Sequence, residues 1–299
     1  MPSSITRSET AGSATSTPST PSPKRRSAGS LTARVLSAIV FLPLFVWIVR
    51  TGGLLFTLFV GIVVVLATAE TYRMLTPSLR PFLPFGIAAA VMLIALLATG
   101  FSNLIFPFLT ILFVLLFLAL LATHAPDSAR SGGQVLFAFF YAAFLPSHLL
   151  LIRLLPESGT TGIESGAAFV FLLFLAAWGT DTGAYFTGRW IGRTPLAPVI
   201  SPKKTVEGAA GGIVWALLAG WLAHVWFLPG LSLVHCLLIS LGASLLGQAG
   251  DLCESVLKRQ AGIKDSAHWI PGHGGVLDRF DAIIFAAPFT YIYLRMVLA

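Results

Sequence analysis

A polar segment near the C-terminus, residues 255–281, holds side chains that could do chemistry. It reads SVLKRQAGIKDSAHWIPGHGGVLDRFD, although only 10% of the residues in the chain are charged. Cations suit phosphate groups, carboxylates suit a hard metal ion, and the glycines around its histidine let the backbone approach a ligand closely. The segment therefore predicts a site for a phosphate-bearing ligand. Its candidate residues are Lys258, Arg259, Lys264, Asp265, His273, Gly274, Gly275, Asp278, Arg279 and Asp281.

The carboxylates in and before this segment have helical spacing. Asp251 and Glu254 would share one helix face with Ser255 and Lys258, and Asp278 would share a face with Asp281 in the same way. A loop that folds back could bring Asp251 close to Asp278. Two facing carboxylates must bind a cation or share a proton. The alternative is a set of salt bridges with Lys258 and Arg279 at a membrane interface.

A second polar block covers residues 178–208. Its turn, Ser201-Pro202-Lys203-Lys204-Thr205, precedes a glycine-rich apolar run, and two lysines beside the N–H groups of a helix start form an anion site. The alternative is that these lysines only anchor the chain at a membrane surface. Asp181 lies inside an apolar segment, where a carboxylate at mid-bilayer costs ~2.5–3.5 kcal/mol. We expect it either to line a watery cavity or to bond with Thr182 or Tyr185.

These polar blocks must be positioned by apolar helices. Hydrophobic residues make up 56% of the 299 residues and the mean hydropathy is +0.86, which indicates a polytopic membrane protein. The apolar runs lack the alternation of barrel strands, so the fold class is all-α. The predicted spans are approximately residues 35–50, 53–70, 83–100, 103–123, 133–154, 166–187, 208–228, 231–250 and 282–298.

The chain divides into three parts. Residues 1–31 are rich in Ser, Thr and Pro, cannot bury enough apolar surface to fold, and are predicted to be a disordered cytoplasmic tail. Residues 32–165 are predicted to form N-terminal transmembrane helices. Residues 166–299 contain both polar blocks and are predicted to form the catalytic transmembrane region. The two cysteines are too few for a disulfide framework.

The cations predict an orientation. If the N-terminus is cytoplasmic, all of the 19 Lys and Arg except Arg50, Arg153 and Arg295 lie on the cytoplasmic side. Both polar blocks then face the cytoplasm, where nucleotides are found, and the odd number of spans puts the C-terminus outside. The net charge of +7 is thus explained by topology, and we expect no nucleic-acid partner.

Together the two blocks resemble the phosphatidate cytidylyltransferases, or CDP-diacylglycerol synthases. The family pattern is a Ser, Lys-Arg, Lys-Asp, Pro-Gly-His-Gly-Gly, Asp-Arg and a final Asp, and residues 178–208 resemble the upstream region of the family. The matching elements here are Ser255, Lys258-Arg259, Lys264-Asp265, residues 271–275, Asp278-Arg279 and Asp281. The departures are Ala282 where the family has Ser and Gly192-Arg193 where Gly-Lys is common.

The resemblance implies an all-helical dimeric enzyme of the bacterial inner membrane, with its site facing the cytoplasm. It would transfer the cytidylyl group of CTP to phosphatidate, giving CDP-diacylglycerol and pyrophosphate. It would use Mg²⁺ held by Asp251 and Asp278, with a second cation possible. The implied catalytic residues are Asp251, Asp278, Lys258, Arg279, His273 and Asp281. The implied substrate-binding residues are Ser201, Lys203, Lys204, Asp181, Arg259, Lys264, Asp265, Gly274 and Gly275.

Two other functions stay open from the sequence. A CTP-dependent kinase of polyprenols or other lipids would use the same nucleotide but transfer its γ-phosphate. An ion-coupled transporter would place its acids at mid-bilayer. The carboxylates here cluster at a loop instead, and we find no internal repeat of the kind typical of inverted-repeat transporters.

Overall fold

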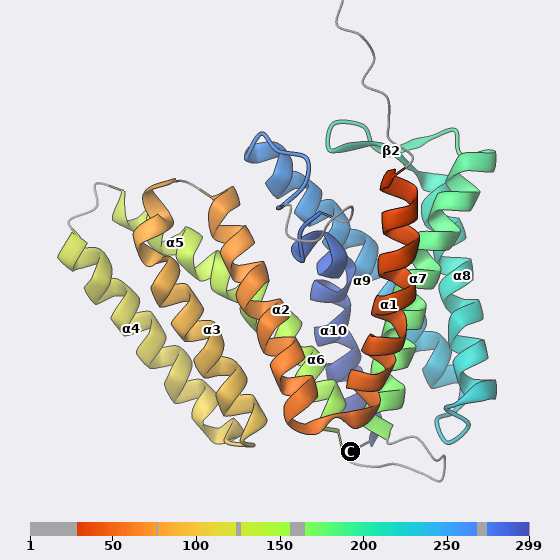
Figure 1. Ribbon diagram of the computed structural model, residues 1–299, viewed down its shortest axis with the longest axis horizontal. Helices are drawn as coiled ribbons and strands as arrows, with labels where there is room; N and C mark the ends of the chain where they lie inside the picture. The colour runs from red at the N-terminus through yellow and green to blue at the C-terminus, as the bar shows by residue number, and fades with distance from the viewer. Residues whose placement is uncertain (1–28, 76, 124–126, 156–164, 268–273, 299) are drawn as a thin grey trace, which may run out of the picture.

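The structure is a computed structural model that describes residues 29–75, 77–123, 127–155, 165–267 and 274–298. It is a bundle of helices with one short hairpin (Figure 1). The elements are α1 (Gly29–Thr51), α2 (Gly53–Met74), η1 (Pro77–Phe82), α3 (Leu83–Ala98), η2 (Ser102–Leu104), α4 (Ile105–Thr123), α5 (Ser128–Phe139), η3 (Phe140–Phe144), α6 (Leu145–Arg153), α7 (Ser165–Ile191), β1 (Pro195–Ala197), β2 (Ser201–Thr205), α8 (Val206–Trp226), α9 (Leu233–Gln260) and α10 (Leu277–Leu298).

The helices confirm the predicted all-α polytopic membrane protein. Within the described residues, eight helical segments are long and apolar enough to cross a membrane, and the part of α1 from Ile39 to Thr51 is a shorter apolar helix. Each of the nine predicted spans therefore coincides with a helix. α5, η3 and α6 follow one another without a break and together form one crossing, with a π-helical turn in its middle.

The predicted boundaries differ from the observed ones at the polar blocks. α9 runs on to Gln260 instead of ending near residue 250, and α10 begins at Leu277 instead of residue 282. Hydropathy marks only the part of a helix that suits lipid, so polar turns that continue the helix beyond it were missed. At the other end of the chain, α1 begins at Gly29, so residues 29–31 of the predicted tail are helical, while residues 1–28 lie outside the described residues.

The C-terminal helices form the most closely packed part of the molecule. α7 packs along α8, α8 and α10 pack against α9, and α10 also contacts α6. Glycines allow the close approach of α8 to α7, because a Cβ at Gly208 or at Gly212 would come within 2.9 Å of a carbonyl oxygen of α7. α2, α3, α4 and α5 lie to the other side of α10 (Figure 1).

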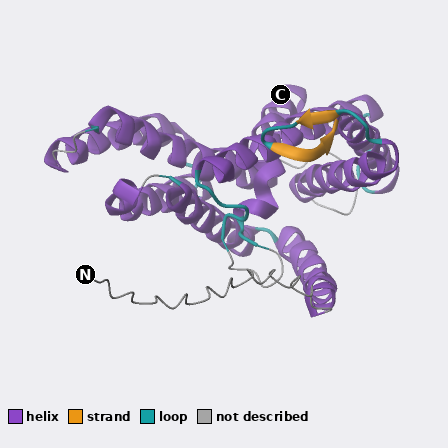
Figure 2. Ribbon diagram, turned by 90° about the horizontal axis from the view of Figure 1, so that it is seen from above, coloured by secondary structure: helices purple, strands orange, loops and turns teal. Residues whose placement is uncertain are grey.

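The polar connections gather at one end of the bundle. The hairpin, the connection from α9 to α10 and the start of α1 lie at the top in Figure 1, whereas the C-terminus and the turn between α1 and α2 lie at the bottom. Seen from above, the two strands lie to one side of the molecule over helix ends (Figure 2). The helix order thus brings the two polar blocks of the sequence to the same end.

Candidate active site

A cavity of about 480 Å³ opens between α7, the hairpin, α8 and α9. Its size is within the usual range for small-molecule sites. Three cations and two acids stand in its wall, so it suits a ligand that carries several negative charges. The lining residues are Thr180, Asp181, Ala184, Tyr185, Gly188, Arg189, Leu196, Lys203, Lys204, Thr205, Gly208, Ala209, Gln248 and Asp251.

The hairpin holds the two lysines in this wall. β1 and β2 pair antiparallel, and Thr205 caps α8 by accepting the N–H of Gly208 at 3.1 Å. Glu207, in the first turn of α8, accepts the backbone N–H of Arg193 at 3.0 Å and that of Thr194 at 3.2 Å. The chain before β1 is thereby tied to the start of α8. These contacts fix the direction in which the lysines of β2 project.

Lys204 makes the link from the hairpin to α9, where its ammonium forms an ion pair with the Asp251 carboxylate. Arg259 makes a second link, because its Nε donates to the carbonyl oxygen of Ile200 at 3.4 Å. A cation of the block 178–208 and an acid just before the segment 255–281 therefore meet in the cavity wall.

Next to the cavity, three carboxylates form what we call the acid triad: Asp251, Glu254 and Asp281. Their oxygens lie within 4.8 Å of one another. Asp251 and Glu254 share a face of α9, and Asp281 faces them from α10. The two helices approach closely at Gly250, where a Cβ would lie 2.5 Å from the carbonyl oxygen of Asp281.

The acid triad has the properties of a cation site. Glu254 is fully buried, and among the described residues its Oε1 has no hydrogen-bond partner. Leaving a buried carboxylate oxygen without a donor is costly, and a bound cation would satisfy it. Three carboxylates are also the oxygen ligands that a hard divalent cation prefers.

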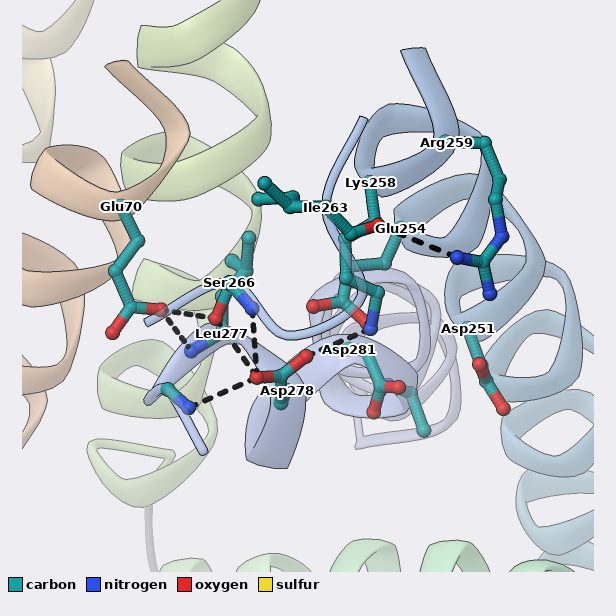
Figure 3. Close-up of polar contacts among 12 residues, drawn as sticks. Glu70, Asp251, Glu254, Lys258, Arg259, Ile263, Ser266, Leu277, Asp278 and Asp281 are labelled. Atoms are coloured by element: carbon teal, nitrogen blue, oxygen red, sulfur yellow. Dashed lines mark hydrogen bonds and ion pairs between the residues drawn. The ribbon is translucent and has the colours of Figure 1, made fainter. Parts of the chain in front are cut away.

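Asp278 is not part of the acid triad, because its oxygens already accept several hydrogen bonds (Figure 3). Its Oδ1 accepts from Lys258 Nζ at 2.7 Å. Its Oδ2 accepts from the backbone N–H groups of Ser266 at 3.0 Å and Gly275 at 2.9 Å, and it lies 3.0 Å from Ser266 Oγ. The structure therefore groups Asp251 with Glu254 and Asp281, and the Asp251–Asp278 metal pair stays a prediction.

Lys258 stands between the two groups of acids. Its Nζ lies 2.6 Å from Glu254 Oε2 and 2.7 Å from Asp278 Oδ1, and all three side chains are largely shielded from solvent. Lys258 and Glu254 lie on one face of α9, as the sequence predicts. The ion pair between Lys258 and Asp278 crosses from α9 to α10 and fixes the two helix ends to each other.

The other candidate residues differ in how close they lie to the cavity. Asp181, Lys203 and Lys204 line the cavity. Ser201 is half-buried at the start of β2, and Gly274 has a φ of +85°, which favours glycine. His273 lies outside the described residues. The exposed residues that do not line the cavity are Arg259, Lys264, Asp265 and Arg279.

Sequence reasoning assigned no role to two acids that the structure singles out. Glu254 was placed on the face of Asp251 but not among the cation ligands. Glu70, on α2, is fully buried and contacts the loop before α10. The sequence signal for Glu70 is its position at the end of an apolar run. A carboxylate in a membrane helix costs free energy, so this position indicates a specific partner. The sequence does not say which partner.

Comparison with known proteins gives one family along nearly the whole chain. The sequence profile of the cytidylyltransferase family matches residues 32–297. A protein of Bacillus subtilis (strain 168) named phosphatidate cytidylyltransferase is 36% identical over 271 residues, which cover 88% of this chain and 95% of that protein. A protein of Synechocystis sp. with the same name is 34% identical over 293 residues, covering 89% and 97%. One from Staphylococcus saprophyticus is 33% identical over 267 residues, covering 88% and 99%.

Proposed function

This chain belongs to the cytidylyltransferase family, and from that premise we propose that it transfers the cytidylyl group of CTP to phosphatidate. The products are CDP-diacylglycerol and pyrophosphate. The observation that carries the proposal is the placement of three cavity cations, Arg189, Lys203 and Lys204, beside the acid triad. A triphosphate needs cations along its length, and a divalent ion would neutralise charge on its phosphate oxygens. The cavity wall supplies the cations, and the acid triad would hold the ion.

The acid triad is the proposed holder of Mg²⁺, in place of the Asp251–Asp278 pair expected from the sequence. Asp278 has its oxygens engaged by Lys258, Ser266 and Gly275, whereas Glu254 Oε1 has no donor among the residues that the structure describes. Mg²⁺ takes few protein carboxylates and completes its shell with water and substrate phosphates. When bound, it would neutralise negative charge on the phosphate oxygens of the nucleotide.

The residues of the chain would then act by binding and orientation. Lys203 and Arg189 hold phosphate oxygens in the cavity, and Lys204 stands between the cavity and Asp251. A phosphate oxygen of phosphatidate forms a bond to the α-phosphorus of CTP. The bond from that phosphorus to the β-phosphate oxygen breaks, and pyrophosphate leaves with the electron pair. The attacking phosphate is already ionised near neutral pH, so the site needs no general base, and its main contributions are alignment and electrostatics.

The proposed site faces the cytoplasm of a bacterial cell. The support is the placement of the cations of both polar blocks at the end of the bundle where α1 begins, and the positive-inside rule assigns that end to the cytoplasm. CTP would enter from this side, and phosphatidate would enter from the surrounding bilayer. The homodimer in this proposal rests on the family resemblance alone.

Purified protein incubated with phosphatidate, Mg²⁺ and CTP labelled at the α-phosphate tests this function. The expected result is label in a lipid product, with unlabelled lipid when the label is on the γ-phosphate. Lipid labelled only from γ-labelled CTP would identify a lipid kinase instead. If neither nucleotide labels lipid under conditions where the protein remains folded, the proposed function is wrong and ion-coupled transport becomes the function to test.

A further inference from the structure

Glu70 is an acidic residue of the N-terminal helices that contacts the loop before α10. It lies on α2, and its side chain is fully buried. Burying a carboxylate costs free energy unless hydrogen-bond donors surround it, so the partners of Glu70 indicate its role. Among the described residues, those partners come from the C-terminal part of the chain, 196 to 207 residues away.

Both oxygens of Glu70 accept hydrogen bonds from the start of α10 and the loop before it. Oε1 accepts the backbone N–H of Val276 at 2.9 Å, and Oε2 accepts that of Leu277 at 2.8 Å. Because α10 begins at Leu277, these are N–H groups that a helix start leaves without partners in the helix itself. The negative charge also complements the positive end of the helix dipole. Glu70 therefore caps α10 from another helix.

The same carboxylate is joined to Asp278 through one hydroxyl group. Ser266 Oγ lies 2.8 Å from Glu70 Oε2 and 3.0 Å from Asp278 Oδ2 (Figure 3). The space between them is filled, because a Cβ on Gly275 would overlap Ser266 Oγ and would lie 2.6 Å from Glu70 Oε2. The lack of space for a side chain at Gly275 therefore explains why this position is a glycine.

We propose that Glu70 is a positioning residue for cytidylyl transfer, one that fixes the first turn of α10 and through it the directions of Asp278 and Asp281. Asp278 is in that first turn and Asp281 is one turn further, where it joins the acid triad. A rotation or shift of the helix start would move Asp281 away from Asp251 and Glu254. This inference rests on the proposed function, but its geometric part can be measured without activity.

The test compares Glu70→Gln with Thr71→Val in the full-length protein. The amide keeps the size of the side chain but removes its charge and turns an NH₂ group toward backbone donors. We expect kcat to fall about tenfold to a hundredfold, which is the loss of a charge-assisted hydrogen bond, while KM for CTP changes less than about threefold. The Mg²⁺ concentration for half-maximal activity should rise by about tenfold. Thr71 is equally buried, but among the described residues its hydroxyl donates within α2, to Ala67 O at 2.8 Å, so its variant should match the wild type.

Hydrogen–deuterium exchange supplies a readout that does not depend on activity. In Glu70→Gln, the amides of Val276 and Leu277 should exchange at least about tenfold faster, with no change in α8. Ser266→Ala is the second variant, because it removes the bridging hydroxyl but leaves both backbone bonds of Glu70. It should lower kcat by about threefold to tenfold at normal yield, and combined with Glu70→Gln it should add little.

Two results would overturn the inference while leaving the proposed function intact. One is an active wild type beside a Glu70→Gln protein with normal kcat per folded molecule and normal Mg²⁺ dependence. The other, which decides the matter if Glu70→Gln does not fold, is a Ser266→Ala protein with wild-type kcat. If the wild type itself does not label lipid, the proposed function fails, but faster exchange at Val276 and Leu277 would still support the capping by Glu70.

Discussion

The two groups of acids beside the α9–α10 connection differ in how many donors they face. Glu70 and Asp278 are surrounded by backbone N–H groups, the Ser266 hydroxyl and, for Asp278, the Lys258 ammonium. In the acid triad, one oxygen of Glu254 has no donor within the described part of the chain. A carboxylate whose oxygens all accept hydrogen bonds holds neighbouring segments in place. A buried carboxylate oxygen with no donor among the described residues can instead bind a ligand. The difference separates the residues that position the site from those that bind the cation.

The largest expected effect comes from the acid triad. Asp281→Asn keeps the shape of the side chain and removes a charge from the proposed cation site, so kcat/KM should fall about a thousandfold or more. Asp251→Asn should behave alike, and the double variant should be scarcely worse than either single variant, because both act through one ion. Lipid labelling from α-labelled CTP, normalised to folded protein in detergent, measures this. If the Asp281→Asn protein retains most of its activity, the acid triad does not bind the cation that the reaction needs.

Asp278→Asn should give a smaller and different loss. It breaks the pair with Lys258, so we expect a lower unfolding temperature and about a tenfold to hundredfold loss of kcat. Raised Mg²⁺ should not restore the activity, because the defect lies in the connection between α9 and α10. A thermally normal Asp278→Asn protein whose activity returns at high Mg²⁺ would make Asp278 a cation ligand, as first expected from the sequence, and would end the distinction between the two groups.

Substitution of a hairpin lysine should weaken the use of CTP and leave the Mg²⁺ dependence unchanged. Lys203→Ala removes a cation from the cavity wall, and a charge-assisted contact to phosphate is worth ~1.5–3 kcal/mol. That corresponds to about a tenfold to hundredfold loss in kcat/KM for CTP, with an unchanged Mg²⁺ dependence. Arg295→Ala is the control, since this exposed arginine lies near the other end of α10. Equal kinetics of the two variants would mean that Lys203 is only a membrane anchor.

The smallest effect should follow from removing residues 1–23. They precede α1 and lie outside both polar blocks, so the truncated protein should retain activity within about twofold once it is inserted in the membrane. The comparison is made at equal amounts of purified, folded protein. A large loss would show that the N-terminal segment contributes to the site.

Much of the fold was predictable from the sequence, because a long apolar run without charges has few alternatives to a membrane helix. The cavity wall was predictable in part, since Asp181 lies in an apolar segment and Lys203 and Lys204 lie in a polar turn before one. The exact ends of α9 and α10 were not, because polar turns continue a helix without an apolar signal. Whether Asp278 or Asp281 turns toward Asp251 depends on how α10 is rotated against α9.

The contacts of Glu70 could not be predicted from the sequence. Its partners Val276 and Leu277 donate through the backbone, so no side-chain pattern marks them, and they lie more than 200 residues further along the chain. Only the packing of α2 against the α10 end of the bundle reveals the contact. The same holds for Glu254, because whether its Oε1 meets a donor among the described residues depends on how the neighbouring side chains pack.

Binding of Mn²⁺, as a paramagnetic substitute for Mg²⁺, tests the central claim most directly. Electron paramagnetic resonance would follow Mn²⁺ titrated into purified protein with CTP present and phosphatidate absent. We expect the wild type and Asp278→Asn to bind Mn²⁺ with affinities within about threefold of each other, and Asp281→Asn and Glu254→Gln to bind at least about tenfold more weakly. Loss of Mn²⁺ binding in Asp278→Asn, with normal binding in Asp281→Asn and Glu254→Gln, would contradict the account.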